Sequence, residues 1–163
     1  MNKTIATIVA LTLLTACGTT KEASEKRRIE KAQEEQALKE ALDKHEFRVE
    51  VNRVLPMSLP PETVTDYDVT IRHDSIFSCL PFRGRAYNLP YGGGDGLRFD
   101  SKITHYAEHQ GKHTRDITIE TKTNEDTYTF YISISASGMA QISVNSRNRE
   151  TITFDGNAYP VEE

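Results

Sequence analysis

From Phe47 to the end of the chain, apolar and polar residues alternate with a period of two, and this pattern constrains the fold most strongly. It is clearest over residues 127–136, where four apolar side chains occupy every second position: Tyr128, Phe130, Ile132 and Ile134. Successive side chains of a β-strand point to opposite faces, so a period of two puts all four on one face. The pattern therefore predicts strands that bury one face and expose the other.

Shorter segments with the same period recur around residues 47–51, 69–71, 76–80, 115–123, 140–144 and 152–154. Turn-forming residues separate them, as at Ser137-Gly138, and a turn at Asp155-Gly156-Asn157 is expected after the last segment. Short linkers make neighbouring strands pair antiparallel. No helix-length segment interrupts the series, which argues against a parallel sheet. We therefore expect an all-β fold: one antiparallel up-and-down meander of about eight strands, as a small lipocalin-like barrel or a sandwich, preceded by an N-terminal helix.

The expected helix covers residues 21–46, which are rich in Ala, Glu, Lys, Gln and Leu and contain no Pro. An apolar stripe forms only near its end, where Leu38, Ala41, Leu42 and His45 follow the i, i+3, i+4, i+7 spacing. The first two-thirds should therefore be a solvated stalk, and the last turns should dock on the β domain. No heptad repeat supports a coiled coil.

The first residues resemble a bacterial lipoprotein signal. Lys3 precedes a short apolar run over residues 5–14, which ends in Leu14-Thr15-Ala16-Cys17. We expect a signal peptide over residues 1–16, a lipidated Cys17 with a charged helical stalk over 17–46, and a β domain over 47–163. Acyl chains on Cys17 would attach the protein to a membrane of the cell envelope, and we expect this to be the outer membrane. The protein would face either the periplasm or the cell surface. The alternative is an ordinary secretory signal in which Cys17 only happens to lie at the cleavage point.

Composition argues against binding to nucleic acid and against a disulfide bond. The formal net charge is −4, so there is no electrostatic basis for binding nucleic acid. After lipidation of Cys17, Cys79 would be the one remaining cysteine, and no disulfide could form within the mature chain. Cys79 lies in the apolar run 75–80, which indicates a buried packing thiol rather than a reactive one.

Three histidines recur every four residues: His105, His109 and His113. On one helix they would line up as metal ligands. Gly111 and its turn lie inside the set, however, and the flanking residues alternate as strands do. Two arms of a hairpin could still pair two of the imidazoles, whereas the simpler interpretation is that all three are exposed and uncoordinated.

A second set of candidates comprises Arg83, Arg85, Tyr87 and Tyr91. If residues 82–87 are extended, the two arginines point the same way and could contact an anionic ligand or form a salt-bridged rim. No Gly-x-Ser-x-Gly elbow, HExxH motif or calcium loop occurs, so we assign no catalytic residue and expect no cofactor.

The segments Leu80-Pro81-Phe82-Arg83-Gly84-Arg85-Ala86-Tyr87, Gly92-Gly93-Gly94 and Ile152-Thr153-Phe154-Asp155-Gly156 resemble domain-of-unknown-function family 4251. This family consists of bacterial lipoproteins, and the similarity runs from about Phe47 to Gly156. The resemblance implies an all-β, lipocalin-like domain behind a lipoprotein signal. It implies no activity and no functional residues.

These observations favour a membrane-anchored envelope lipoprotein that binds another envelope protein or a small apolar ligand and is not an enzyme. Two alternatives remain open. One is a metal-dependent hydrolase that uses the His105/His109/His113 region. The other is an inhibitor of a foreign hydrolase that acts through loops such as residues 90–96.

Overall fold

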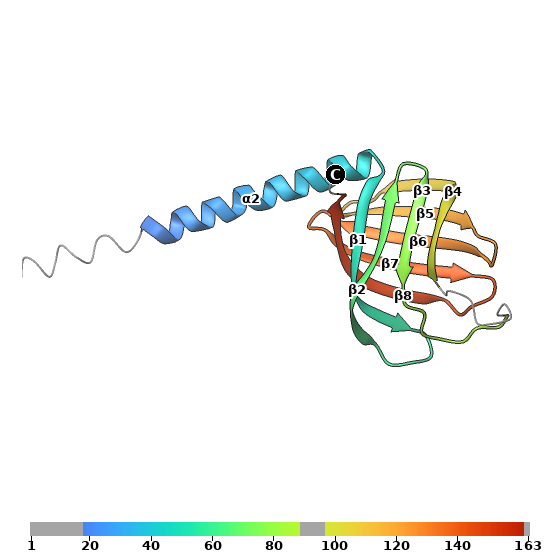
Figure 1. The fold of residues 1–163 in the computed structure, drawn as a ribbon. Helices are drawn as coiled ribbons and strands as arrows, with labels where there is room; N and C mark the ends of the chain where they lie inside the picture. The colour runs from blue at the N-terminus through green and yellow to red at the C-terminus, as the bar shows by residue number, and fades with distance from the viewer. Residues whose placement is uncertain (1–17, 89–96, 162–163) are drawn as a thin grey trace, which may run out of the picture. The chain divides into compact units, whose positions relative to one another are not determined.

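The described part of the chain forms eight antiparallel strands that follow one helix (Figure 1), and seven of these strands contain the alternating segments named above. A computed structural model describes residues 18–88 and 97–161. The elements are α2 (Gly18–Asp43), β1 (Glu46–Pro56), β2 (Glu62–Arg72), β3 (Ser75–Leu80), β4 (Leu97–Gln110), β5 (Thr114–Lys122), β6 (Thr127–Ser135), β7 (Met139–Ser146) and β8 (Ile152–Pro160).

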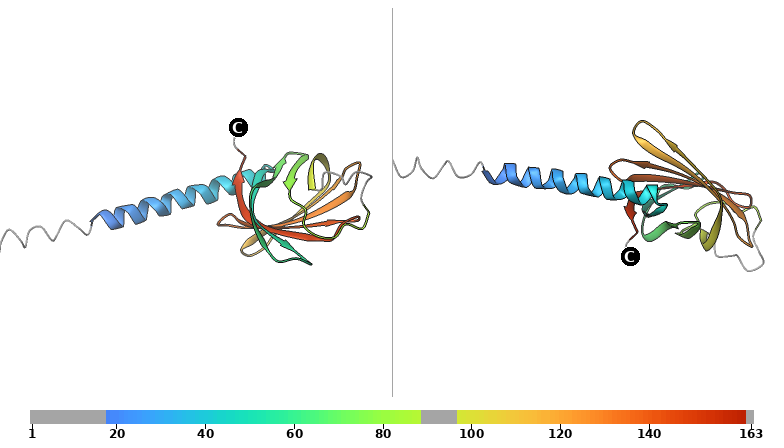
Figure 2. Two further views of the ribbon diagram at one scale, coloured as in Figure 1. Left: turned by 60° about the horizontal axis from the view of Figure 1, so that its bottom comes forward. Right: turned by 90° about the horizontal axis from the view of Figure 1, so that it is seen from above.

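The eight strands close into a barrel (Figures 1 and 2). Each strand pairs with the next one in the sequence, and β8 closes the sheet by pairing antiparallel with β1. Val49, for example, lies opposite Val69 of β2 and Ala158 of β8. Of the two predicted architectures, the barrel is therefore the one that forms.

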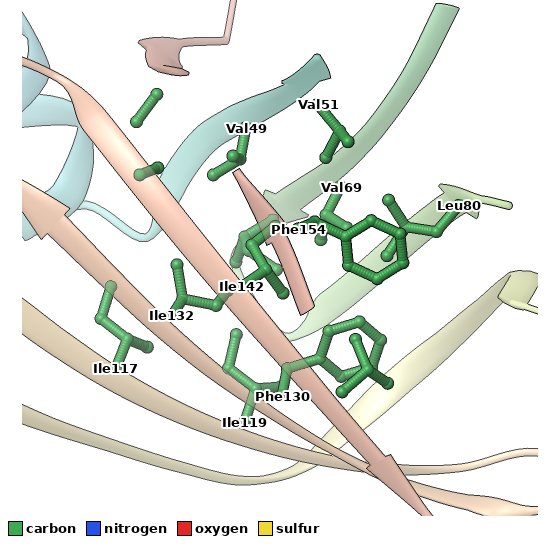
Figure 3. Packing of buried hydrophobic residues seen from close by; sticks show 14 of the residues in the cluster. Val49, Val51, Val69, Leu80, Ile117, Ile119, Phe130, Ile132, Ile142 and Phe154 are labelled. Carbon is green, nitrogen blue, oxygen red and sulfur yellow. The ribbon is translucent and has the colours of Figure 1, made fainter. Parts of the chain in front are cut away.

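The core is the inside of this barrel, and the alternating apolar residues fill it (Figure 3). Phe47, Phe130 and Phe154 are 0% exposed, and Tyr128 is 1% exposed. The prediction that Tyr128, Phe130, Ile132 and Ile134 face inward is confirmed, because all four are buried.

The turn predicted at Asp155-Gly156-Asn157 is wrong, because these residues continue strand β8. At Gly156, strands β1 and β8 approach each other closely. The register of β1 shifts between Val51 and Arg53, and Gly156 lies opposite Val51. A Cβ atom at Gly156 would collide with the backbone carbonyl of Glu50. Glycine is therefore required here by the closeness of two backbones.

The chain divides into two compact units, one ending at Gln36 and the other covering Ala37–Glu163. In the first unit, residues 23–34 of α2 are exposed. In the second, Leu38, Ala41 and Leu42 are buried with the barrel core, as the apolar stripe predicts. Within the described residues, no helix combines the length and apolarity needed to cross a bilayer.

The helix ends earlier than predicted. It stops at Asp43, because His45 adopts the left-handed conformation with φ 56° and its N–H donates to the carbonyl of Leu42. His45 therefore does not continue the apolar stripe. Its ring stacks instead on Tyr106, with the ring centroids 4.1 Å apart.

Cys79 is only half-buried, which corrects the prediction of a buried thiol. In β3 the inward positions are Ile76, Ser78 and Leu80, so the alternation turns Cys79 outward. The inward polar residue is Ser78, whose hydroxyl donates to the carbonyl of Leu97 at 2.7 Å. The prediction was wrong because it counted all the apolar neighbours of Cys79 in the sequence, and these lie on both faces of the strand.

Candidate functional site

One end of the barrel carries three of the candidate residues: Arg83, Arg85 and Tyr87. We call it the loop end and define it by residues 57–61, 81–88, 123–126 and 147–151. Glu150 ties three of its segments together, because its Oε2 atom accepts from the Ser58 hydroxyl at 2.8 Å and from the Arg85 backbone N–H at 3.1 Å. These two hydrogen bonds lower the pKa of Glu150, and the bond from the Arg85 N–H has the larger effect.

The segment 81–88 brings Arg83, Arg85 and Tyr87 to this end, but not on a strand. A single bridge between Ala86 and Arg149 is its one ladder contact among the described residues. The Nε atom of Arg83 donates to Glu62 at 3.1 Å. The segment bends at Gly84, which lies between the two arginines. Arg83 forms an ion pair with Glu62, which is the kind of contact that the rim interpretation expects. Tyr91 and residues 90–96 lie outside the described residues.

Arg149 is a buried cation that the sequence did not single out. It is 6% exposed, and its guanidinium lies over the ring of Phe82 at 5.3 Å. It pairs with Glu125 at 3.6 Å and hydrogen-bonds to Tyr128, while its Nε atom finds no partner in the described part of the chain. Burial is the main cause that raises the pKa of Tyr128. An arginine within a turn carries no periodicity, so no sequence signal marked it.

The turn beside Arg149 is ordered by one carboxylate. Asp126 is buried, and it accepts the backbone N–H groups of Thr127, Arg147 and Asn148 at 2.8, 3.3 and 3.2 Å. These bonds join the β5–β6 turn to the β7–β8 turn. The loop end is thus a set of fixed loops rather than independent ones.

Large apolar side chains are exposed on this ordered frame. Met57 is 73% exposed, Leu59 51% and Tyr87 65%. Residues 57–61 and 81–88 are adjacent, because Glu150 holds both Ser58 and Arg85. Exposed apolar groups on a rigid frame are typical of a surface that contacts another protein.

A side slit opens in the barrel wall next to the loop end. Its volume is about 340 Å³, and its lining includes residues 98–101, residues 122–125 and Tyr128. The ring of Phe99 stacks on Tyr128 with the centroids 4.7 Å apart and meets Phe130 edge-on at 6.2 Å. Phe99 is only partly buried, so some of its apolar surface remains available in the slit.

The three candidate histidines do not come together. His105 and His109 are exposed on β4, opposite Glu120 and Asp116 of β5, and His113 is exposed in the β4–β5 turn. Residues four apart on a strand are separated by about 13 Å, so one metal ion cannot bind both His105 and His109. Among residues 18–88 and 97–161, no group of three or more His, Cys, Asp or Glu side chains is placed to hold a metal ion.

A polar cluster lies at the other end of the barrel, where the last turn of α2 meets the strands. Arg115 donates from Nη2 to Asp43 at 2.7 Å, and its Nε atom lies 3.3 Å from Glu108. The Tyr106 hydroxyl donates to Glu108 at 3.2 Å. The pKa of Tyr106 is raised mainly by burial and, second, by the negative charge of the Glu108 carboxylate. These contacts attach the end of the helix to the barrel.

Comparison with known proteins agrees with this architecture. The chain is similar to a crystallised DUF4251 family protein from Bacteroides eggerthii, with 17% sequence identity and a TM-score of 0.63. The match covers 81% of this chain and 91% of that one. That likeness concerns the fold alone. None of the curated proteins compared with the chain matches it. The family model for the domain of unknown function DUF4251 matches residues 29–158, so the chain belongs to the DUF4251 family.

Proposed function

We propose that this protein is a lipid-anchored component of the bacterial cell envelope whose barrel binds another envelope protein through its loop end. The observation that carries the proposal is the filled barrel interior. An eight-stranded barrel has room either for its own side chains or for one small ligand. Here Phe47, Phe130 and Phe154 occupy it with no exposed surface, which favours a protein partner over an apolar ligand.

The binding surface would be the exposed apolar group Met57, Leu59 and Tyr87 on the loop end. Interfaces are held mainly by a few large side chains on a rigid frame. The hydrogen bonds of Glu150 and Asp126 supply such a frame, so little ordering entropy opposes binding.

The experiment is quantitative affinity purification of the full-length protein from mildly solubilised envelopes of its host. We expect one stoichiometric protein partner. Met57→Ser and Leu59→Ser should each reduce its recovery about fivefold or more, because each removes an apolar contact. The matched control is Met139→Ser, which alters a methionine of similar exposure (64%) at the start of β7. Recovery of no partner under several detergents would contradict the proposal.

The anchor is tested separately. We expect the mature protein to carry diacylglycerol and palmitate on Cys17, and Cys17→Ser to release it from the membrane fraction. A Cys17→Ser protein that still sediments with membranes would show that another feature attaches it. Intact mass before and after the substitution identifies the acyl chains directly.

A further inference from the structure

We propose that an extended segment of the partner protein binds in the side slit as an added strand beside the first half of β4. The inference rests on the proposed function, since it names how a partner would be held. It begins from a mismatch in strand length. β4 pairs with β3 from Leu97 onward, but its pairing with β5 begins only at Ile103. β5 ends at Lys122, so residues 97–101 of β4 extend past it.

The direction of the backbone groups in this half of β4 follows from the register with β3. The N–H of Ile103 donates to the carbonyl of Asp74 at 2.7 Å, so Ile103 points its backbone groups toward β3. Alternation along the strand then turns the N–H and C=O of Arg98 and Asp100 the other way, into the slit. The Thr121 hydroxyl, which donates to the carbonyl of Lys102 at 2.8 Å, confirms that even-numbered residues face β5.

An unpaired strand edge is matched best by the main chain of another strand. Two residues spaced two apart offer two N–H donors and two C=O acceptors, and a peptide strand supplies their complements at the same spacing. Most of the slit is lined by polar and charged side chains, and Phe99 supplies its partly exposed apolar surface. One side chain that enters the slit would therefore be apolar, against Phe99, and its neighbours would be polar. The expected occupant is therefore a short segment with alternating apolar and polar residues.

The first test measures amide hydrogen exchange by NMR in the full-length protein in detergent micelles. The amides of Arg98 and Asp100 should exchange more than about 100-fold faster than those of Phe99 and Ser101, which are paired with β3. Equally slow exchange at all four positions would overturn the proposal, because the edge would already be occupied.

The second test uses a phage-displayed library of random twelve-residue peptides as the probe. We expect enriched peptides to alternate apolar and polar residues and to slow the exchange of Arg98 and Asp100 in the wild type. Asp100→Pro removes the N–H that faces the slit and leaves the β3 ladder intact, so it should weaken binding about tenfold. Asp100→Asn, which keeps that N–H, is the matched control, and Arg98→Pro replaces Asp100→Pro if the latter does not fold.

The outcomes separate this inference from the proposed function. Absence of enriched peptides, or binding that leaves the exchange of Arg98 and Asp100 unchanged, would overturn strand addition. Strand addition would also be overturned if Asp100→Pro recovered the envelope partner fully while Met57→Ser did not. That result would leave the proposed function standing. Peptide binding with protection at both amides, but no envelope partner, would support the slit and contradict the proposed function.

Discussion

At the scale of single residues, burial distinguishes side chains that build the barrel from those available for binding. Phe154 has no exposed surface, whereas Tyr131 on the outside of β6 is 47% exposed. Both are aromatic residues in regular strands. The difference between them is the face on which alternation places them.

Phe154→Ala should lower the free energy of unfolding by about 3–5 kcal/mol, because it leaves a cavity inside a filled barrel. Tyr131→Ala is the matched control and should change it by less than about 0.5–1 kcal/mol. Urea denaturation of the full-length protein in detergent measures both. A cost for Phe154→Ala as small as that of the control would mean that the interior is loosely packed.

Arg115→Met should destabilise the protein by about 1.5–3 kcal/mol, because it removes charge-assisted contacts to Asp43 and Glu108. The Arg115 side chain is 10% exposed, whereas both carboxylates stay accessible to water, which limits the loss. The comparison is Lys102→Met, which breaks the exposed pair with Asp74 and should cost less than about 1 kcal/mol. Equal effects of the two substitutions in chemical denaturation would refute the structural role of Arg115.

We predict that the protein loses stability at alkaline pH because the Tyr106 hydroxyl ionises. Its pKa is raised above the ordinary value of 10, so the folded state retains a proton that the unfolded state releases. The stabilisation is therefore complete below pH 10 and is lost as the pH rises through the higher folded-state pKa. Thermal melts across this range should show a steeper decline for the wild type than for Tyr106→Phe. Parallel curves would contradict the assignment.

At the scale of elements, periodicity predicted seven of the eight described strands and the docked end of the helix, but not the contacts between loops. It missed β4, because most residues of that strand are exposed or only partly buried. A period of two in residues 127–136 is enough to identify β6 and its inward face, because one physical rule governs every position. Arg149 and Asp126 lie in turns, where position depends on the distant segments that happen to meet there. The same limit applies to the side slit, which arises from the lengths of β4 and β5 in the closed sheet.

The helix combines two parts with different roles, and substitutions in each should differ accordingly. Leu38→Ala should cost about 2–5 kcal/mol, because Leu38 is 5% exposed and packs in the core cluster. Ile29→Ala is the matched control: Ile29 is 52% exposed, and alanine is the better helix former, so stability should not fall. Chemical denaturation of both variants measures the difference. A neutral Leu38→Ala would show that the last turns of α2 do not belong to the folded unit.

At the scale of the whole molecule, the two ends of the barrel differ. The last turns of α2 and the Arg115 cluster cover one end, whereas the loop end holds exposed Met57, Leu59 and Tyr87 on loops tied by Glu150 and Asp126. Closure of the sheet places these loops together although they come from distant parts of the chain. The proposed function, binding of a protein through the loop end, depends on this difference between the two ends.

Native mass spectrometry of the full-length protein, purified from its host in mild detergent, tests this account most directly. It reports a small molecule inside the barrel and a protein bound to its surface in one spectrum. We expect the acylated chain without a further small-molecule mass, together with a complex that contains one additional protein. A small-molecule mass that stays on the barrel, with no protein complex, would contradict the account.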